Sequence, residues 1–486
     1  MNINQPQNLI KNHWMSNHMV KTSQKYKVLI LLILFLSISL RLGLVRYNRQ
    51  SNDAHDEVIS YILKTGNLPE KNDCWECYQP KLFYFTAAQI LQIPWIEVAR
   101  QDISLALAVE LINFVAGVFT LLVVGVFITN LPMKNETHKL LSFGLVALNP
   151  KLIGINSQFT NDTFAILFST LALYFMFLFL QKQKPGTFLL ILLFTLLGIS
   201  SKTNIWVTAI AIPLVLFIKA WLQLKNHAVP VLIGLVFIVS TLTFSILNPL
   251  NQYISNYQKY GSPFLMNMDR QPFPNFFEKT EVARPGIVSI YDGLFTFKFI
   301  DLLKHPIIDN GSDYSANRTS LWTQLYGRAY SVHFDNWPPT WSANGDQDFN
   351  LIRVIFILAL LPTFLLVFGV LLEIFVLTKS IFKRDKVLAS TTHYGLAAIT
   401  LIGYVFFIII YSLLYRDFSV MKVIFIYPAL ITFPLFFIRA VEFFELRLKN
   451  RFHWVRAVFT VWIVTLFVLF TADILTMIQL IYSRMV

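Results

Sequence analysis

Apolar runs long enough to cross a membrane recur from one end of this sequence to the other. Crossing about 30 Å of hydrocarbon takes about 20 residues of helix. Such runs lie at 26–45, 104–130, 140–157, 161–180, 187–201, 204–222, 229–248, 351–378, 391–414, 421–439 and 455–480. The sequence therefore predicts an all-α polytopic membrane protein with about eleven transmembrane helices.

The composition agrees with that of an integral membrane protein. Of its 486 residues, 55% are hydrophobic and only 14% are charged, and the mean hydropathy is +0.57, whereas about a quarter of the residues of soluble domains are charged. The formal net charge of +13 is scattered among short loops and forms no continuous basic face. We therefore expect membrane lipids as partners and no nucleic acid.

The distribution of basic residues predicts the orientation of the spans. Tyr26–Val45 follows several lysines but is too long for a signal peptide and lacks a cleavage site, so we expect a retained helix after a cytoplasmic tail at 1–25. Loops carrying Lys and Arg should be cytoplasmic. With the amino terminus inside, these are Lys134, Lys139, Lys182, Lys184, Lys219, Lys225, Lys379, Lys383, Arg384, Lys386, Arg447, Lys449, Arg451 and Arg456.

The same orientation places two long segments, 46–103 and 249–350, on the outer face. The chain then divides into an N-terminal transmembrane module at 26–248, which includes the first outer loop, the large outer loop at 249–350, and a C-terminal transmembrane module at 351–486. Loops of this length are usually functional or disordered. In the first, the spacing of apolar residues in DEVISYILKTG and the aromatic content of KLFYFTAAQILQIPWI predict two interfacial helices.

The first outer loop begins with an acidic cluster. Asp56 and Glu57 are explained by the first turn of a helix, where acidic side chains favour the positive end of its dipole. Asp53 comes earlier, a few residues after the first span, and is the candidate catalytic carboxylate. His55 is a candidate site residue beside it.

Three more charged residues stand near the expected outer ends of helices. Lys81 lies in the first turn of a helix, where a cation is unfavourable unless an anion is near, although it could equally snorkel to lipid head groups. Asp162 opens a helix that Thr160 or Asn161 would cap. Lys202 ends a hairpin, where it needs hydration or a partner: an anionic phosphate, or Asp162 or Asp53.

The only cysteines, Cys74 and Cys77, occur as CWEC on the outer side. A disulfide in an oxidising compartment, half of a metal site and idle thiols are the three interpretations. Zinc would need further ligands from His55 or the acidic residues, so we favour the disulfide.

The order of these elements resembles that of a known enzyme family. Asp53 after the first helix is followed by GNLP, YQPKLFYF, NPKLIGINSQFTNDTFAIL, GISSKTN and KVIFIYPAL. This order resembles the GT-C glycosyltransferases, in particular the family of protein O-mannosyltransferases and lipid A aminoarabinose transferases. The resemblance is good over about residues 26–210 and loose over the last helices.

The resemblance implies a role for each matching residue. Asp53 would deprotonate the acceptor hydroxyl. Gln79 stands at the family's His or Lys position and Lys81 replaces its second proline, which leaves Lys81 as the candidate cation. Asn161-Asp162 matches the Asn-Asp turn, and Ser201-Lys202 matches the Thr-Lys hairpin. The candidate substrate-binding residues are His55, Asp56, Gln79, Lys81, Asp162, Lys202, Arg328, His333 and Asp335, the last two for acceptor or metal.

The implied activity is an inverting transfer of a hexose or pentose from a polyprenyl phosphate to a protein, lipid or glycan on the outer face. Such a donor places its reactive carbon at the outer interface. Transfer needs a carboxylate for the acceptor proton and cations for the departing phosphate. The resemblance implies no particular cofactor, and a divalent metal is left open. The membrane would be the plasma membrane of a prokaryote or the endoplasmic reticulum of a eukaryote.

Two other function classes compete with this interpretation. A secondary transporter of a lipid or polar solute would also have many helices, but it would keep its ionisable residues near the bilayer midplane, whereas here they gather at the expected outer ends. A scaffold protein predicts no convergence of Asp53, Lys81 and Lys202.

Overall fold

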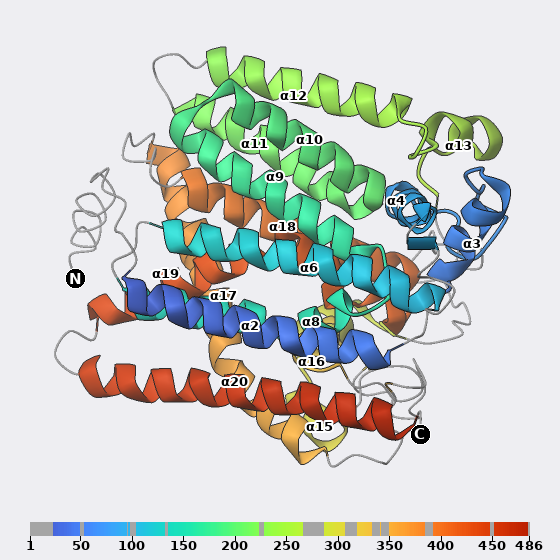
Figure 1. Ribbon diagram of the computed structural model, residues 1–486. Coiled ribbons are helices and arrows are strands. Elements are labelled where there is room, and N and C mark those ends of the chain that lie inside the picture. Colours follow the sequence, from blue (N-terminus) through green and yellow to red (C-terminus); the bar gives the residue numbers. More distant parts are fainter. Residues whose placement is uncertain are drawn as a thin grey trace.

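The computed structural model of the chain is a bundle of long helices with roughly aligned axes (Figure 1). It describes residues 23–48, 53–94, 96–97, 104–131, 135–222, 228–265, 286–306, 318–332, 341, 349–383, 392–447 and 452–484. Within these ranges the regular elements are helices, and no β-strand is present. The predicted all-α polytopic class is confirmed.

Eight helices of the described part are long and apolar enough to span a membrane. They are α2 (Gln24–Tyr47), α6 (Leu105–Asn130), α9 (Asp162–Lys182), α11 (Trp206–Leu222) preceded by the turn η1 (Thr203–Ile205), α12 (Ala228–Leu247), α17 (Asn350–Lys383), α18 (Thr392–Tyr415) and α20 (Phe452–Ser483). The run expected at 187–201 forms α10 (Pro185–Ser201), which is apolar but has only 17 residues.

The run expected at 140–157 is divided into two helices, α7 (Glu136–Ala147) and α8 (Pro150–Asn156). Pro150 occupies the first turn of α8, and the Asn149 side chain accepts a hydrogen bond from the backbone N–H of Leu152 at 2.9 Å. A proline disfavours helical geometry in the residue before it. The first helix therefore ends at the break, and the chain starts a new helix with its own cap.

The run expected at 421–439 is not one helix either. Three short 3₁₀ turns, η5 (Phe418–Val420), η6 (Val423–Phe425) and η7 (Tyr427–Ala429), come before α19 (Thr432–Arg447). Pro428 lies in η7, and inside a continuous helix it would remove a backbone hydrogen bond and clash with the preceding turn. The apolar side chains that predicted a span here instead pack against neighbouring helices, and this packing buries an irregular stretch of backbone.

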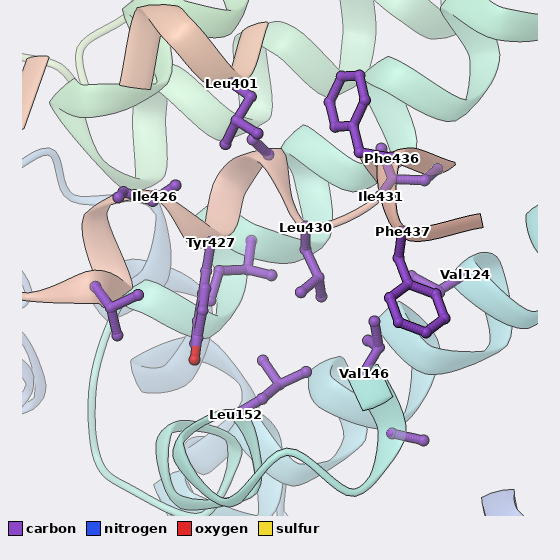
Figure 2. Close-up of a cluster of buried hydrophobic side chains, with 14 of the residues drawn as sticks. Val124, Val146, Leu152, Leu401, Ile426, Tyr427, Leu430, Ile431, Phe436 and Phe437 are labelled. Carbon is purple, nitrogen blue, oxygen red and sulfur yellow. The ribbon is translucent and has the colours of Figure 1, made fainter. Parts of the chain in front are cut away.

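Figure 2 shows how the segment from η7 into α19 is held in the core. Its side chains lie among those of α18, α6, α7 and α8; the labelled residues are Ile426, Tyr427, Leu430, Ile431, Phe436, Phe437, Leu401, Val124, Val146 and Leu152. The Tyr427 hydroxyl also donates a hydrogen bond to Asn149 Oδ1 at 3.1 Å. This packing fixes the backbone that immediately precedes it, residues 418–425.

Smaller helices gather at one end of the bundle. The helices expected in the first outer loop are present as α3 (His55–Thr65) and α4 (Leu82–Leu91), and they lie close to α13 (Tyr253–Tyr260) of the second (Figure 1). The second loop also contains α14 (Ile290–Phe295), α15 (Phe299–Lys304) and α16 (Leu321–Tyr330).

Contacts join these two outer segments directly. The Lys81 backbone N–H donates to Leu250 O at 2.9 Å, and Lys259 forms an ion pair with Glu70. We call this the outer end of the bundle, following the orientation that the charge distribution predicts.

Candidate functional site

Asp53 lies at the turn that leads into α3. Asp53 and Ala54 both have left-handed backbone conformations, with φ of 57° and 54°. Aspartate visits this region more readily than most residues because its short polar side chain can bond locally. The turn presents the carboxylate at the bundle end, where its side chain is 52% exposed.

Asp53 forms an ion pair with a lysine from the far end of the sequence. Lys422 Nζ donates to Asp53 Oδ2 at 3.3 Å. The Lys422 ammonium is the main cause that lowers the pKa of Asp53 to about 2, against a smaller opposing effect of burial. Asp53 is therefore ionised at neutral pH and already shares a cation.

A second ion pair joins Asp162 and Lys202. Lys202 Nζ lies 2.5 Å from Asp162 Oδ1, and the two side chains are only 12% and 7% exposed. Asp162 opens α9 and Lys202 follows the last residue of α10, which packs beside α9. Each charge therefore sits at the helix end whose dipole favours it, and the pairing that the hairpin lysine was expected to need is present.

The two ion pairs are close to each other. Lys202 Nζ lies 5.3 Å from the centre of the Phe425 ring, three residues along the chain from Lys422. Lys202 also contributes to lowering the pKa of Asp53. The outer ends of α2, α9 and α10 and the segment 418–425 thus bring two lysines and two aspartates into one cluster.

His55 borders this cluster without adding a charge at neutral pH. It is 4% exposed, and its Nδ1 lies 2.7 Å from the Tyr84 hydroxyl. Burial lowers the pKa of His55 to about 4, although the nearby Asp53 carboxylate opposes that shift. His55 is therefore placed beside Asp53 as a neutral ring.

Gln79 connects the first outer loop to α9. Its Nε2 donates to Glu76 Oε2 at 2.6 Å, while its Oε1 accepts from Asn161 Nδ2 at 2.8 Å. Asn161 precedes α9 but makes no side-chain capping bond, and its amide nitrogen also donates to Ser201 O at 3.2 Å. Gln79 thus links Glu76 to the turn that carries Asp162.

Lys81 does not join the ion pairs. Its ammonium donates to the backbone carbonyls of Cys77 and Gln79, the latter at 2.7 Å, and the residue is 1% exposed. Burial lowers its pKa to about 7. The contacts in the structure are those of a lysine that holds the fold of its own loop.

Cys74 and Cys77 are disulfide-bonded, as the sequence favoured. Within the described residues, no group of three or more His, Cys, Asp and Glu side chains could hold a metal ion. The disulfide closes the loop on either side of Glu76, and Trp75 in that loop donates its backbone N–H to Glu57 Oε2 at 3.2 Å.

Two of the remaining predicted residues, Asp56 and Arg328, lie in described helices. Asp56 is half-buried in the first turn of α3. Arg328 in α16 is 2% exposed and donates from Nε to Gln324 at 2.9 Å and from Nη2 to Phe418 O at 3.4 Å. His333 and Asp335 fall outside the residues that the structure describes.

Sequence reasoning assigned no role to Lys422 or Glu76. The signal for Lys422 was its isolation, since it is the only charged residue between Asp417 and Arg439 in an otherwise apolar stretch. Glu76 was marked only by lying between the two cysteines, a weak signal.

Comparison with known proteins supports the family resemblance over part of the chain. The family model for dolichyl-phosphate-mannose-protein mannosyltransferase matches residues 98–246. This segment runs from α6 to α12 and contains Asp162 and Lys202, but neither Asp53 nor Lys422. The resemblance to these glycosyltransferases is thus confirmed for the segment that carries the second ion pair.

Two solved structures share a distant overall likeness. They are crystal structures of ArnT from Cupriavidus metallidurans, one bound to undecaprenyl phosphate and one in the apo state. Each is 12% identical with a TM-score of 0.33; the matches cover 78% and 81% of this chain and 76% and 77% of ArnT. A TM-score this low supports no structural conclusion. A search of curated protein sequences finds no match.

Proposed function

We propose that this chain, which matches the mannosyltransferase family model over residues 98–246, is a membrane glycosyltransferase. It moves a sugar from a polyprenyl phosphate to a hydroxyl of a protein, lipid or glycan acceptor on the outer face of the plasma membrane or the endoplasmic reticulum membrane. The observation that carries the proposal is the cluster in which Lys202 and Lys422 face Asp53 and Asp162 at one end of the bundle.

The two lysines supply what a departing phosphate needs. As the bond between the sugar and the phosphate breaks, negative charge grows on the phosphate oxygens, and fixed cations stabilise it. Lys202 is held in place by Asp162, with little side-chain exposure. Lys422 is more accessible, with 33% of its side chain exposed, so it can turn towards a bound phosphate.

Asp53 supplies the base. The acceptor oxygen attacks the anomeric carbon from the side opposite the phosphate, its proton passes to Asp53, and polyprenyl phosphate leaves; the configuration at the sugar is inverted. A carboxylate paired with Lys422 is a weak base. A bound phosphate competes for the same ammonium, which raises the basicity of Asp53 when the donor is in place.

The test is transfer by the purified full chain in lipid nanodiscs, offered a panel of undecaprenyl- and dolichyl-phosphate sugars. Release of polyprenyl phosphate is followed by mass spectrometry. The Asp53→Asn variant keeps the shape of the side chain, and asparagine tolerates the left-handed backbone. It should accumulate normally, while transfer falls by about a hundredfold to ten-thousandfold, the usual contribution of a general base.

The matched control is Asp56→Asn, three residues further on, which should retain most of the activity. If Asp56→Asn fails and Asp53→Asn is active, the base is Asp56. If both variants transfer sugar at the wild-type rate, the carboxylate mechanism is wrong. If no donor of the panel is consumed by the wild type, the proposed activity itself is wrong.

A further inference from the structure

Glu76 is a buried carboxyl that the proposed mechanism does not use. It is 5% exposed, and its side chain accepts a hydrogen bond from Gln79 Nε2 at 2.6 Å. Its charge interacts with those of Asp53, Lys202 and Lys422, the groups that form the candidate donor site. The charge state of Glu76 therefore affects the affinity of the site for an anion.

The charges of the site can be counted. Asp53 and Asp162 balance Lys202 and Lys422, and His55 is neutral. A polyprenyl phosphodiester brings one negative charge. The remaining basic group that faces Glu76 is Lys81, whose own pKa burial lowers to about 7. If Glu76 were ionised while Lys81 was neutral, the occupied site would hold two uncompensated negative charges in a partly buried place, where like charges repel strongly.

We propose that Glu76 is a donor-site residue that takes part in phosphate binding as the uncharged acid, so that binding of the donor is coupled to protonation of this carboxyl. The proposal rests on the proposed function, because it assigns the charge state of the same site. Glu76 acts here through the lysines and Gln79, as a positioning residue.

The surroundings of Glu76 support a neutral carboxyl. Burial is the main cause that raises its pKa to about 7, and the charge of Asp53 adds to it, while Gln79, Lys202 and Lys422 oppose the shift. The other groups that face it are Tyr78 and Lys81 of its own loop and Tyr84 of α4. A bound anion raises the pKa further, so the protonated form binds better.

The hydrogen bond to Gln79 is compatible with either state of Glu76. Gln79 Nε2 donates to a carboxyl oxygen, and an acid, a carboxylate or an amide can all accept through such an oxygen. Proton uptake therefore needs no rearrangement of the Glu76–Gln79–Asn161 line. For the same reason Glu76→Gln imitates the uncharged acid while removing its titration.

The test measures binding without turnover. Methyl farnesyl phosphate, a sugar-free phosphodiester with one permanent charge, is titrated into the full chain in nanodiscs by calorimetry between pH 6 and pH 8.5. For the wild type, the dissociation constant should rise by up to about tenfold per pH unit above pH 7. Two buffers with different ionisation enthalpies should reveal uptake of up to one proton. Glu76→Gln should bind with a constant nearly independent of pH.

The matched control is Glu70→Gln, on the same outer loop but half exposed and paired with Lys259; it should keep the wild-type pH dependence. If Glu76→Gln kept the wild-type pH dependence of binding, the inference would be overturned. If Lys81→Met then abolished that pH dependence, Lys81 would be the group that titrates. If the wild type binds the probe equally at every pH, Glu76 plays no such part, although the proposed function stands. Absence of binding at any pH would overturn the inference, whereas the transfer assay decides the proposed function.

Discussion

Lys422 lies 3.3 Å from Asp53 although 369 positions separate them in the chain. The contact joins the first outer loop to the segment that leads into α19. That segment is held by the packing around Tyr427 and Phe437 shown in Figure 2. A long-range ion pair of this kind places a cation where the proposed donor phosphate must leave, and it leads to the first prediction.

Replacing Lys422 by Met should weaken donor use by about tenfold to a hundredfold, the effect of losing a charge-assisted hydrogen bond of about 1.5–3 kcal/mol. The loss should appear in kcat/KM for the donor. Lys422→Arg, which keeps the charge, should recover part of it. The control is Lys259→Met, which removes an exposed lysine paired with Glu70. Equal activity of Lys422→Met and the wild type would remove Lys422 from the site.

Replacing Lys202 by Met should reduce both stability and transfer. The substitution leaves the Asp162 carboxylate buried without its partner, and breaking a buried pair in this way typically costs about 3–5 kcal/mol. The double variant Lys202→Met, Asp162→Asn should regain most of the melting temperature, because Thr160 can still donate to the amide oxygen at residue 162.

The rate of sugar transfer by the double variant distinguishes the two roles of Lys202, which are pairing with Asp162 in the fold and binding phosphate. The double variant should remain inactive if the lysine binds phosphate, although its fold is restored. A double variant that is both stable and fully active would show that the Asp162–Lys202 pair serves the fold alone.

Opening the Cys74–Cys77 disulfide should lower transfer. The disulfide closes the loop that carries Glu76, and Cys77 O accepts a hydrogen bond from Lys81. Constraining so short a loop contributes about 2 kcal/mol. If the open loop must be ordered at that cost in each turnover, the Cys74→Ser, Cys77→Ser variant should lose about thirtyfold in activity while still accumulating in the membrane. Dithiothreitol should reproduce the loss in the wild type and leave the double variant unchanged. A reductant effect of equal size in the double variant would exclude the disulfide as its cause.

The buried His55 should make the fold sensitive to acid. Its pKa is about 4 in the folded chain, against 6.5 for an ordinary histidine. The unfolded chain therefore binds the proton more readily between these values, so stability is lost as the pH falls from about 6.5 to 4. The melting temperature of His55→Gln should fall less over this pH range than that of the wild type.

The exposed His305 provides the comparison for that measurement. His305→Gln, which removes an exposed imidazole, should follow the wild-type profile. Parallel profiles for His55→Gln and the wild type would mean that burial of the imidazole carries no pH-dependent free energy.

The helices themselves could be predicted because hydropathy is a local property. A run such as Tyr26–Val45 must be buried in lipid or protein whatever its neighbours are, and α2 is found there. The runs at 140–157 and 421–439 also lie in helical regions, but their breaks at Pro150 and Pro428 depend on whether neighbouring helices can cover irregular backbone. The mean hydropathy of such a run stays high despite one proline, so it does not reveal the break.

The sequence by itself determined that Asp53, Asp162 and Lys202 stand near helix ends at one face of the bundle, since chain position fixes how far each lies from an apolar run. Only the tertiary structure decided which charges meet. Lys81 donates to carbonyls of its own loop, whereas Lys422, the first residue of the stretch KVIFIYPAL and one to which the sequence assigned no role, reaches Asp53. The reason is physical: an ion pair depends on atoms within about 4 Å of each other, and that proximity is set by the packing of segments hundreds of residues apart.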